Sequence, residues 1–291
     1  MAEPVIEDVA EGGLSGTLLR PALDRTSAVL LIAGSGPTDR DGRSRSVAAP
    51  YLKNLAEGLA ARGIASLRYD KRGVGRSAAA APNEADLRFD HYVADAERWL
   101  GWMREHNDLG PVTIAGHSEG ALIAIRLLSR VKADHLILLA PPGRTFGAVL
   151  RDQLRDTPMP PELSEEALTI LGTLERGESP PSVSRPLYPL FRPSVQPYLR
   201  SMIAIDPARE LASLNGPVMI VSGGRDLQIG ESDIAALMRA RPDAVPFHRA
   251  TMNHVLADAP DDREGNVLLY ADVETPLAPG VADAVATFVA R

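Results

Sequence analysis

The sequence of 291 residues contains no cysteine. This absence excludes a disulfide framework, a thiolate metal site and a cysteine nucleophile. Basic side chains are in the minority, with 31 lysines and arginines against 38 aspartates and glutamates, so the formal net charge is −7. A surface that coats nucleic acid needs a basic patch, and this acidic balance argues against one. We therefore expect no nucleic-acid partner.

Long apolar runs are missing as well. The longest, such as residues 28–33 and 136–140, fall far short of the ~20 residues that span a bilayer. The first nine residues carry three acidic side chains and lack the basic start and apolar run of a secretory signal. We therefore expect a cytoplasmic protein without a membrane span.

What the chain does contain is an alternation of short apolar runs with stretches of helical spacing. The pattern predicts strands at residues 5–9, 14–19, 28–33, 64–69, 112–115, 135–140, 217–222 and 245–248. It predicts helices at residues 50–62, 89–106, 122–131, 234–239 and 281–290. Strands that alternate with helices across short connections predict an α/β fold, in which helices cover both faces of a mostly parallel sheet.

The alternation lapses between residues 141 and 215, where no apolar run predicts a buried strand. Prolines crowd into this stretch, and apolar residues persist in it, so it is not a disordered linker. We interpret it as short helices broken by proline that form an inserted cap. The predicted organisation is a core domain of residues 1–140 and 216–291 with a cap domain of residues 141–215. An apolar cap can close a site or mediate a homodimer, and the sequence leaves both open.

The strongest local motif is Gly116-His117-Ser118-Glu119-Gly120, which matches the pattern G-x-S-x-G. It lies between a predicted strand and a predicted helix, where a serine occupies a sharp turn that projects its Oγ away from the sheet. The N-terminus of the following helix offers N–H groups and a positive dipole end to a developing oxyanion. A pattern of three fixed letters also arises by chance, but this position favours Ser118 as a nucleophile.

A serine hydroxyl is a poor nucleophile until a base takes its proton, and the usual base is a histidine oriented by a carboxylate. His254 lies in a loop after the last short strand, where its side chain can reach the carboxyl edge of the sheet. The order serine, acid, histidine along the chain favours the same residue. His91 and His106 are better explained as solvated, and His135 and His248 as structural. The side chain of His117, beside Ser118 in sequence, is expected to point away from it.

The acid of the triad must lie between these two residues. Asp226 follows a predicted strand directly, in Gly223-Gly224-Arg225-Asp226, which places it at the same edge of the sheet. Asp206 and Asp233 are more simply explained as helix N-caps or solvated charges. Asp258 is too close to the predicted base to need the fold for its position. Asp226 is therefore the predicted acid.

A second oxyanion donor is expected from the glycine-rich loop at residues 34–42. We assign the N–H of Ser35, paired with the N–H of Glu119, with Gly36 as the alternative to Ser35. A phosphate-binding loop is excluded because neither G-x-x-x-x-G-K-[ST] nor G-x-G-x-x-G is present in this loop.

These features together resemble α/β-hydrolase-fold serine hydrolases of the bacterial carboxylesterase and serine-aminopeptidase-like branch. Loop 34–42 resembles a subgroup described as carboxylesterases, although Ala33 stands where many relatives have histidine. The resemblance implies that the segment 70–77 fixes the loop beside the sheet and has no catalytic role. The matching stretches are spread over residues 28–291 and comprise Gly34-Ser35-Gly36-Pro37, Asp70–Ser77, Gly116–Gly120, Gly224-Arg225-Asp226 and Asn253-His254.

The resemblance implies acyl transfer, in which Ser118 attacks a carbonyl, His254 accepts its proton and Asp226 holds the imidazole. No metal and no organic cofactor is expected. The first hypothesis is a carboxylesterase for small esters.

Three other hypotheses stay open. A thioesterase and a peptidase or amidase would use the same triad, and a ligand receptor on this fold would not use it. A peptidase needs acidic groups for a substrate amine, and the cap offers three candidates that are also explained as a solvated helix start: Glu162, Glu165 and Glu166.

Overall fold

The computed structural model describes residues 3–23 and 25–291, so residues 1, 2 and 24 of the expected core lie outside the described residues. The described residues form one eight-stranded sheet in the order β1-β2-β4-β3-β5-β6-β7-β8. β2 pairs antiparallel with both β1 and β4, and every other neighbouring pair is parallel. The strands are β1 Val5–Glu11, β2 Leu14–Arg20, β3 Thr26–Ile32, β4 Ala65–Tyr69, β5 Leu109–His117, β6 Leu136–Leu139, β7 Val218–Gly223 and β8 Val245–Arg249.

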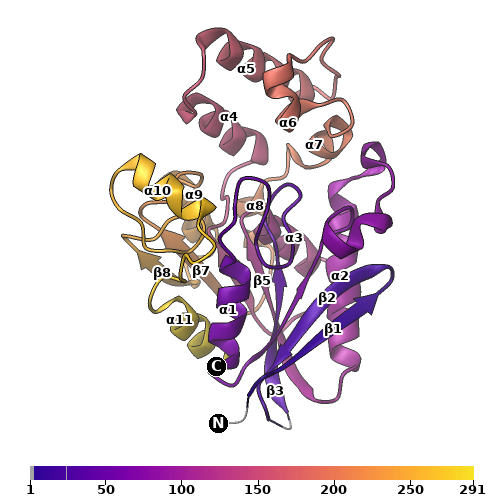
Figure 1. Cartoon of the computed structure of the whole chain (residues 1–291), viewed down its shortest axis with the longest axis vertical. Helices are drawn as coiled ribbons and strands as arrows, with labels where there is room; N and C mark the ends of the chain where they lie inside the picture. Colours follow the sequence, from indigo (N-terminus) through magenta and orange to yellow (C-terminus); the bar gives the residue numbers. More distant parts are fainter. Residues whose placement is uncertain (1–2, 24) are drawn as a thin grey trace.

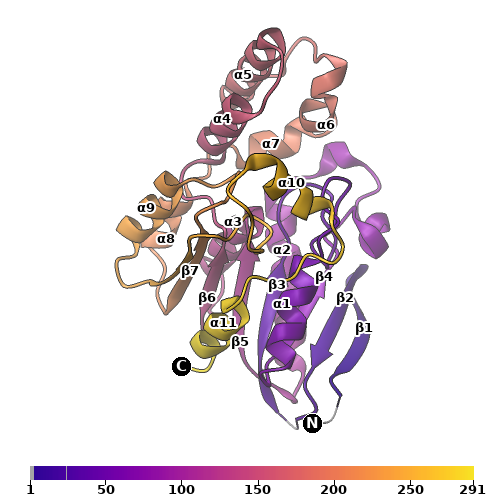
Figure 2. The ribbon, with the colours of Figure 1, turned by 60° about the vertical axis from the view of Figure 1, so that its left-hand side comes forward.

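Helices cover both faces of the sheet, as Figures 1 and 2 show. Helices α1 (Tyr51–Ala60) and α11 (Val281–Val289) lie side by side on one face. Helices α2 (Phe89–Glu105), α3 (Glu119–Leu128) and α8 (Pro207–Ala212) lie on the other face, and α9 (Glu231–Ala240) packs against α8. The predicted α/β architecture is therefore confirmed.

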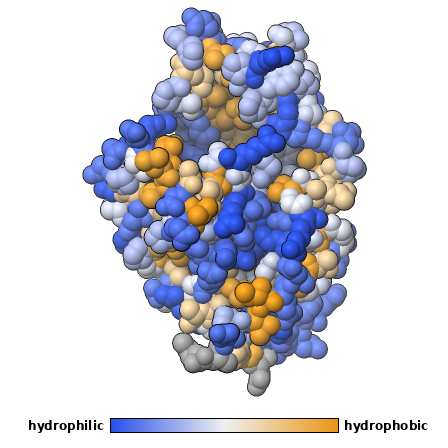
Figure 3. All heavy atoms as spheres, viewed as in Figure 1, coloured by the Kyte–Doolittle hydropathy of each residue, from blue (hydrophilic) through white to orange (hydrophobic). Residues whose placement is uncertain are grey.

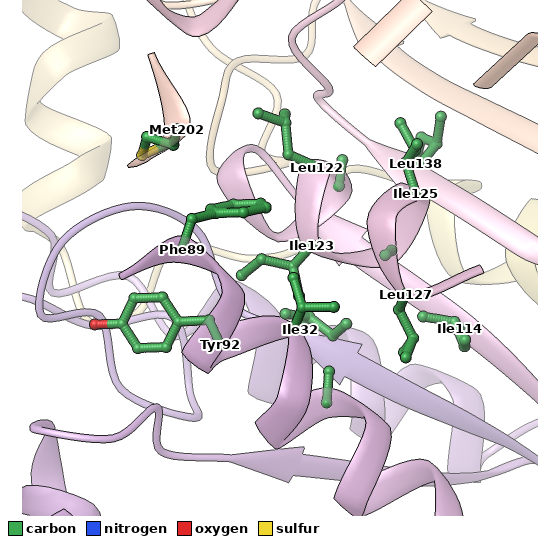
Figure 4. Close-up of a cluster of buried hydrophobic side chains, with 14 of the residues drawn as sticks. Ile32, Phe89, Tyr92, Ile114, Leu122, Ile123, Ile125, Leu127, Leu138 and Met202 are labelled. Carbon is green, nitrogen blue, oxygen red and sulfur yellow. The ribbon is translucent and has the colours of Figure 1, made fainter. Parts of the chain in front are cut away.

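The strand sequences explain this layering. Successive side chains of a strand point to opposite faces, so a strand that is apolar throughout fills two cores. In β3, Leu30 and Ile32 belong to the core beneath α2 and α3, whereas Val29 and Leu31 belong to the core beneath α1 and α11. Figure 4 shows the first of these cores, in which Ile32 lies among side chains of α3.

A group of helices that comes between β6 and β7 in the sequence stands above the carboxyl edge of the sheet (Figures 1 and 2). It comprises α4 (Phe146–Asp156), α5 (Pro161–Glu175), α6 (Tyr188–Phe191) and α7 (Gln196–Met202). Prolines lie in the first turns of α5, α6 and α7, where the missing N–H costs no hydrogen bond, so these prolines start helices and do not break them. Because α8 packs on α3 and α9, the last residues of the proposed cap, 141–215, lie beside the core helices.

Helix α10 (Arg263–Ala271) was not expected from the sequence. Its buried residue is the polar Asn266, while Leu268 is 64% exposed, so the helix lacks the core-facing apolar stripe by which a helix is recognised. Across residues 3–23 and 25–291, no helix is both long enough and apolar enough to cross a membrane.

Candidate active site

Ser118 lies on the turn between β5 and α3, with a backbone φ of 53° and ψ of −119°. A positive φ is strained for a residue other than glycine, and such strain is held only where the surrounding structure enforces it. The glycines of the motif permit the close packing that holds it here. A Cβ on Gly116 would overlap the carbonyl oxygen of Gly120, and a Cβ on Gly120 would overlap the carbonyl oxygen of Ile32. Only a turn this tight lets α3 begin directly behind the serine.

The structure brings His254 and Asp226 together. Nδ1 of His254 lies 2.8 Å from Oδ2 of Asp226, and both side chains are buried. The other carboxylate oxygen of Asp226 accepts the N–H groups of Gln228 at 2.7 Å and Ile229 at 3.0 Å. A carboxylate accepts the Nδ1–H, so this contact selects the tautomer that leaves Nε2 of His254 as a proton acceptor.

Two buried amides join the loops that carry this pair. Asn253 accepts the N–H groups of Val255 and Ala257, which shapes the turn around His254. Its Nδ2 donates to Oδ1 of Asn266 at 3.0 Å, and Nδ2 of Asn266 donates to the carbonyl oxygen of Arg225 at 2.8 Å. The residue before the histidine is thereby linked to the residue before the aspartate. Sequence reasoning missed Asn266 because it lies on the unexpected helix α10.

His117 is buried beside the site. Its Nε2 lies 2.8 Å from the carbonyl oxygen of His254 and must donate to it, while the hydroxyl of Tyr51 donates to Nδ1 at 3.1 Å. Burial, together with the nearby His254, holds the pKa of His117 well below its ordinary value, so its ring is neutral. The neighbour of Ser118 in sequence therefore supports the main chain of His254.

The loop at residues 34–42 lies against Ser118, because a Cβ on Gly34 would lie 3.4 Å from the Cβ of Ser118. Thr38 donates from its hydroxyl to the carbonyl oxygen of Ser35 at 2.7 Å, and Gly36 has a φ of 70°. Glu119 is the first residue of α3, so its N–H has no partner within the helix. Two backbone segments next to Ser118 thus offer the amides assigned to the oxyanion hole.

The other acidic candidates are engaged elsewhere. Asp206 accepts the N–H of Arg209 as the N-cap of α8, and Asp258 pairs with Arg249. Asp233 is fully buried and not a solvated charge, which corrects the expectation from the sequence. It accepts the N–H groups of Gly143 and Arg144 and pairs with the Arg144 guanidinium at 2.8 Å. These contacts join α9 to the start of the cap.

The three cap glutamates differ in their surroundings. Glu162 and Glu165 are exposed on α5. Oε1 of Glu166 accepts the N–H of Ser184 at 2.7 Å and so holds a loop of the cap.

Two cavities flank the site. One of about 140 Å³ borders Gly36 and Pro37 of the glycine-rich loop and extends to Tyr92 and Tyr198. A second, of about 410 Å³, lies beside Asp226 and is lined mainly by small and apolar residues of the β7–α9 region. Figure 3 shows that the face of the molecule seen in Figure 1 is hollowed between the cap and the core, with hydrophobic residues on the cap side.

Two comparisons of the sequence with known proteins find relatives. Residues 48–172 match the model of the family described as serine aminopeptidase, S33. The chain is 32% identical over 233 residues to esterase EstD of Thermotoga maritima, which covers 78% of this chain and 53% of that protein, so the chain spans about half the length of this relative.

Solved structures of esterases share the fold. Esterase Pf2001 of Pyrococcus furiosus superposes with a TM-score of 0.56 at 16% identity, over 99% of this chain and 92% of that one. Est1E of Butyrivibrio proteoclasticus with bound ferulic acid superposes with a TM-score of 0.60 at 16% identity, over 97% of this chain and 96% of that one. The chain therefore has the α/β-hydrolase fold, as its motifs predict. Within this fold, part of the chain matches the S33 family model, and the relatives named above are esterases.

Proposed function

We propose that the protein is a serine carboxylesterase for small esters, with Ser118 as nucleophile, His254 as base and Asp226 as the acid that orients the base. The observation that carries the proposal is the buried imidazole–carboxylate pair at 2.8 Å, built at the sheet edge that also holds a strained serine. Strain and buried charge at one place are typical of a catalytic site and are costly elsewhere.

The proposed reaction has two halves. Ser118 Oγ attacks the ester carbonyl carbon while Nε2 of His254 takes the hydroxyl proton. The oxyanion accepts the N–H groups of Ser35 and Glu119, each worth about 10²–10³ in rate. The imidazolium then protonates the departing alcohol, which leaves an acyl group on Ser118. Water that gives its proton to His254 attacks this acyl-enzyme, and collapse releases the acid and restores the serine.

An ester fits the surroundings better than a peptide with a free amine. Recognition of an α-ammonium group needs an available carboxylate near the triad. The cap glutamates are exposed or hold a loop. Glu84 pairs with Arg192 and Glu119 with Lys71. Asp39, within the glycine-rich loop, accepts the N–H groups of Asp41 and Arg43. The Thermotoga relative named as an esterase supports the same choice.

We propose that the 140 Å³ cavity beside Gly36 takes the acyl group. Its volume is close to that of an engineered apolar cavity of ~150 Å³ that binds benzene, so it holds about six non-hydrogen atoms. Activity on p-nitrophenyl esters should therefore be highest for chains of up to about six carbons. A steady rise in kcat/KM toward long chains would contradict this assignment.

The test of the function compares p-nitrophenyl esters, aminoacyl p-nitroanilides and an acyl thioester of the same chain length. We expect the wild type to hydrolyse the short esters fastest, and Ser118→Ala to abolish that activity. Faster turnover of the anilides would favour a peptidase, faster turnover of the thioester would favour a thioesterase, and ligand binding without turnover would favour a receptor.

The acid has a matched test within the chain. Asp226→Asn should lower kcat by about 10⁴, because an amide no longer selects the required histidine tautomer. Asp206→Asn, which keeps an acceptor at the N-cap of α8, should leave kcat within about twofold, since Asn caps as well as Asp. Equal losses in the two variants would remove Asp226 from its proposed role.

A further inference from the structure

A lysine ammonium is buried completely behind the glycine-rich loop. Lys71, directly after Tyr69 and Asp70 at the end of β4, is 0% exposed. Its Nζ donates to the carbonyl oxygen of Gly34 at 2.5 Å and to Oε1 of Glu119 at 3.2 Å, and it lies 4.9 Å from the ring centre of Tyr92. A buried ion pair is often no more stable than an apolar pair of the same shape, so its presence here points to something other than stability.

The two partners of Lys71 carry the two amides of the proposed oxyanion hole. The Gly34 carbonyl and the Ser35 N–H belong to one peptide group, and in a trans peptide they point to opposite sides. An ammonium bound to that oxygen therefore turns the Ser35 N–H away from Lys71. The same ammonium holds the side chain of Glu119, whose own N–H is the second donor. One cation thus fixes the orientation of both segments.

Charge gives a second reason for the pair. The Glu119 carboxylate is 2% exposed and belongs to the residue next to Ser118, where negative charge develops during acyl transfer. Unpaired, it would oppose that charge in a medium where water screens little. Lys71 neutralises it. Its bond to the Gly34 oxygen also polarises the peptide, which makes the Ser35 N–H a stronger donor.

We propose that Lys71 and the carboxylate of Glu119 are positioning residues of the oxyanion hole. They act through the backbone amides of Ser35 and Glu119 and do not touch the substrate. The proposal rests on the proposed function, since it presumes that an oxyanion forms beside Ser118. It gives the segment 70–77 a part in transition-state binding, beyond the fixing of a loop.

The experiment compares Lys71→Met, Glu119→Gln and the double variant with the wild type. Single variants leave a buried charge unpaired and lower the folded fraction, whereas the double variant removes both charges and keeps the shape of both side chains. Arg144→Met with Asp233→Asn is the control, because this pair also has one fully buried carboxylate, and its side-chain hydrogen bonds go to residues 143, 144 and 152 and not to the segments of the oxyanion hole. Urea unfolding, kcat and KM for p-nitrophenyl butyrate, and binding of a trifluoromethyl ketone are measured for each.

The trifluoromethyl ketone separates positioning from folding, because it adds to Ser118 and places an oxyanion in the hole. We expect Lys71→Met to lower kcat about 100-fold with KM within about threefold, and to weaken ketone binding by a factor similar to the loss in kcat/KM. Glu119→Gln should lose less, because the ammonium still holds the Gly34 oxygen. The double variant should regain the wild-type unfolding midpoint but stay at least 10-fold below both the wild type and the control in kcat.

A double variant that regains both the wild-type unfolding midpoint and the wild-type kcat would overturn the proposal, because the pair would then be structural. So would a Lys71→Met enzyme whose ketone affinity, corrected for the folded fraction, is unchanged. These results can be told apart from failure of the proposed function. In that case the wild type itself hydrolyses no ester and binds no ketone, and both proposals fail together.

Discussion

At the scale of single residues, the neighbourhood of Ser118 is held by side chains that do no chemistry of their own. His117 donates to the carbonyl oxygen of His254 and accepts from Tyr51, so it must be neutral with its proton on Nε2. Burial is the main reason that its pKa lies below the ordinary value of 6.5. This neutrality has a consequence for stability, because the same imidazole is free to take a proton once the chain unfolds.

We expect acid to destabilise the protein through His117. Below pH 6.5 the unfolded chain binds a proton at this residue and the folded chain does not, so the free energy of unfolding falls as the pH drops. The slope from this group reaches about 1.4 kcal/mol per pH unit. His117→Gln keeps a donor and an acceptor but cannot titrate, so its urea-derived stability should fall less steeply between pH 6.5 and 5.

The chosen pH window isolates this histidine from the paired carboxylates. Hydrogen bonds from Arg192 are the largest influence that lowers the pKa of Glu84, so its contribution to stability is lost only below the ordinary value of 4.5. Parallel slopes for the wild type and His117→Gln would show that His117 already titrates normally in the folded protein.

At the scale of elements, the β5–α3 turn depends on contacts that leave no room for a side chain. Gly120→Ala should cost about 3 kcal/mol or more in the free energy of unfolding, because the added Cβ meets the backbone of β3 and cannot be accommodated by a rotamer change. Urea unfolding measures the loss, and an insoluble variant is the extreme form of the same result.

The matched control is Gly101→Ala in helix α2. A Cβ there meets nothing within 4 Å, so the substitution should stabilise the helix by up to ~1 kcal/mol. A Gly120→Ala protein as stable as Gly101→Ala would show that the turn is looser than the structure describes.

The same elements show what could be predicted from sequence. Strands such as β3 and β6 contain unbroken apolar runs, and the G-x-S-x-G turn lies between a strand and a helix, so the fold and the candidate nucleophile could be predicted from local sequence. Asn266 and Lys71 are different. Each owes its place to a polar contact with a residue at least 13 positions away in sequence, Asn253 in one case and Gly34 in the other, and such contacts leave no periodic pattern.

At the scale of the whole molecule, an ion pair joins cap and core at the rim of the 140 Å³ cavity. Glu84, in the 3₁₀ turn Glu84–Asp86 of the core, pairs with Arg192 between α6 and α7 and also accepts the hydroxyl of Ser194. The cap otherwise meets this part of the core through α7, which packs against α2. We infer that this contact helps to set how closely the cap covers the proposed acyl cavity.

Arg192→Met should therefore weaken substrate binding more than it slows chemistry. A partly exposed ion pair contributes at most about 1 kcal/mol, so KM for a short ester should rise by up to about fivefold while kcat stays within twofold. Arg176→Met, whose pair with Glu178 lies within the cap and is exposed, is the control and should change neither constant. A fall in kcat with unchanged KM would place Arg192 in the chemical step.

The central claim is that Ser118 is a nucleophile activated by His254. A fluorophosphonate, which reacts covalently with an activated serine, tests it directly when the labelled protein is weighed intact and then mapped by peptide mass spectrometry. The account predicts one adduct per chain, on the peptide that contains Ser118, absent from Ser118→Ala and at least 10³-fold slower to form in His254→Ala. An adduct on another residue, or one that forms as fast in Ser118→Ala as in the wild type, would contradict it.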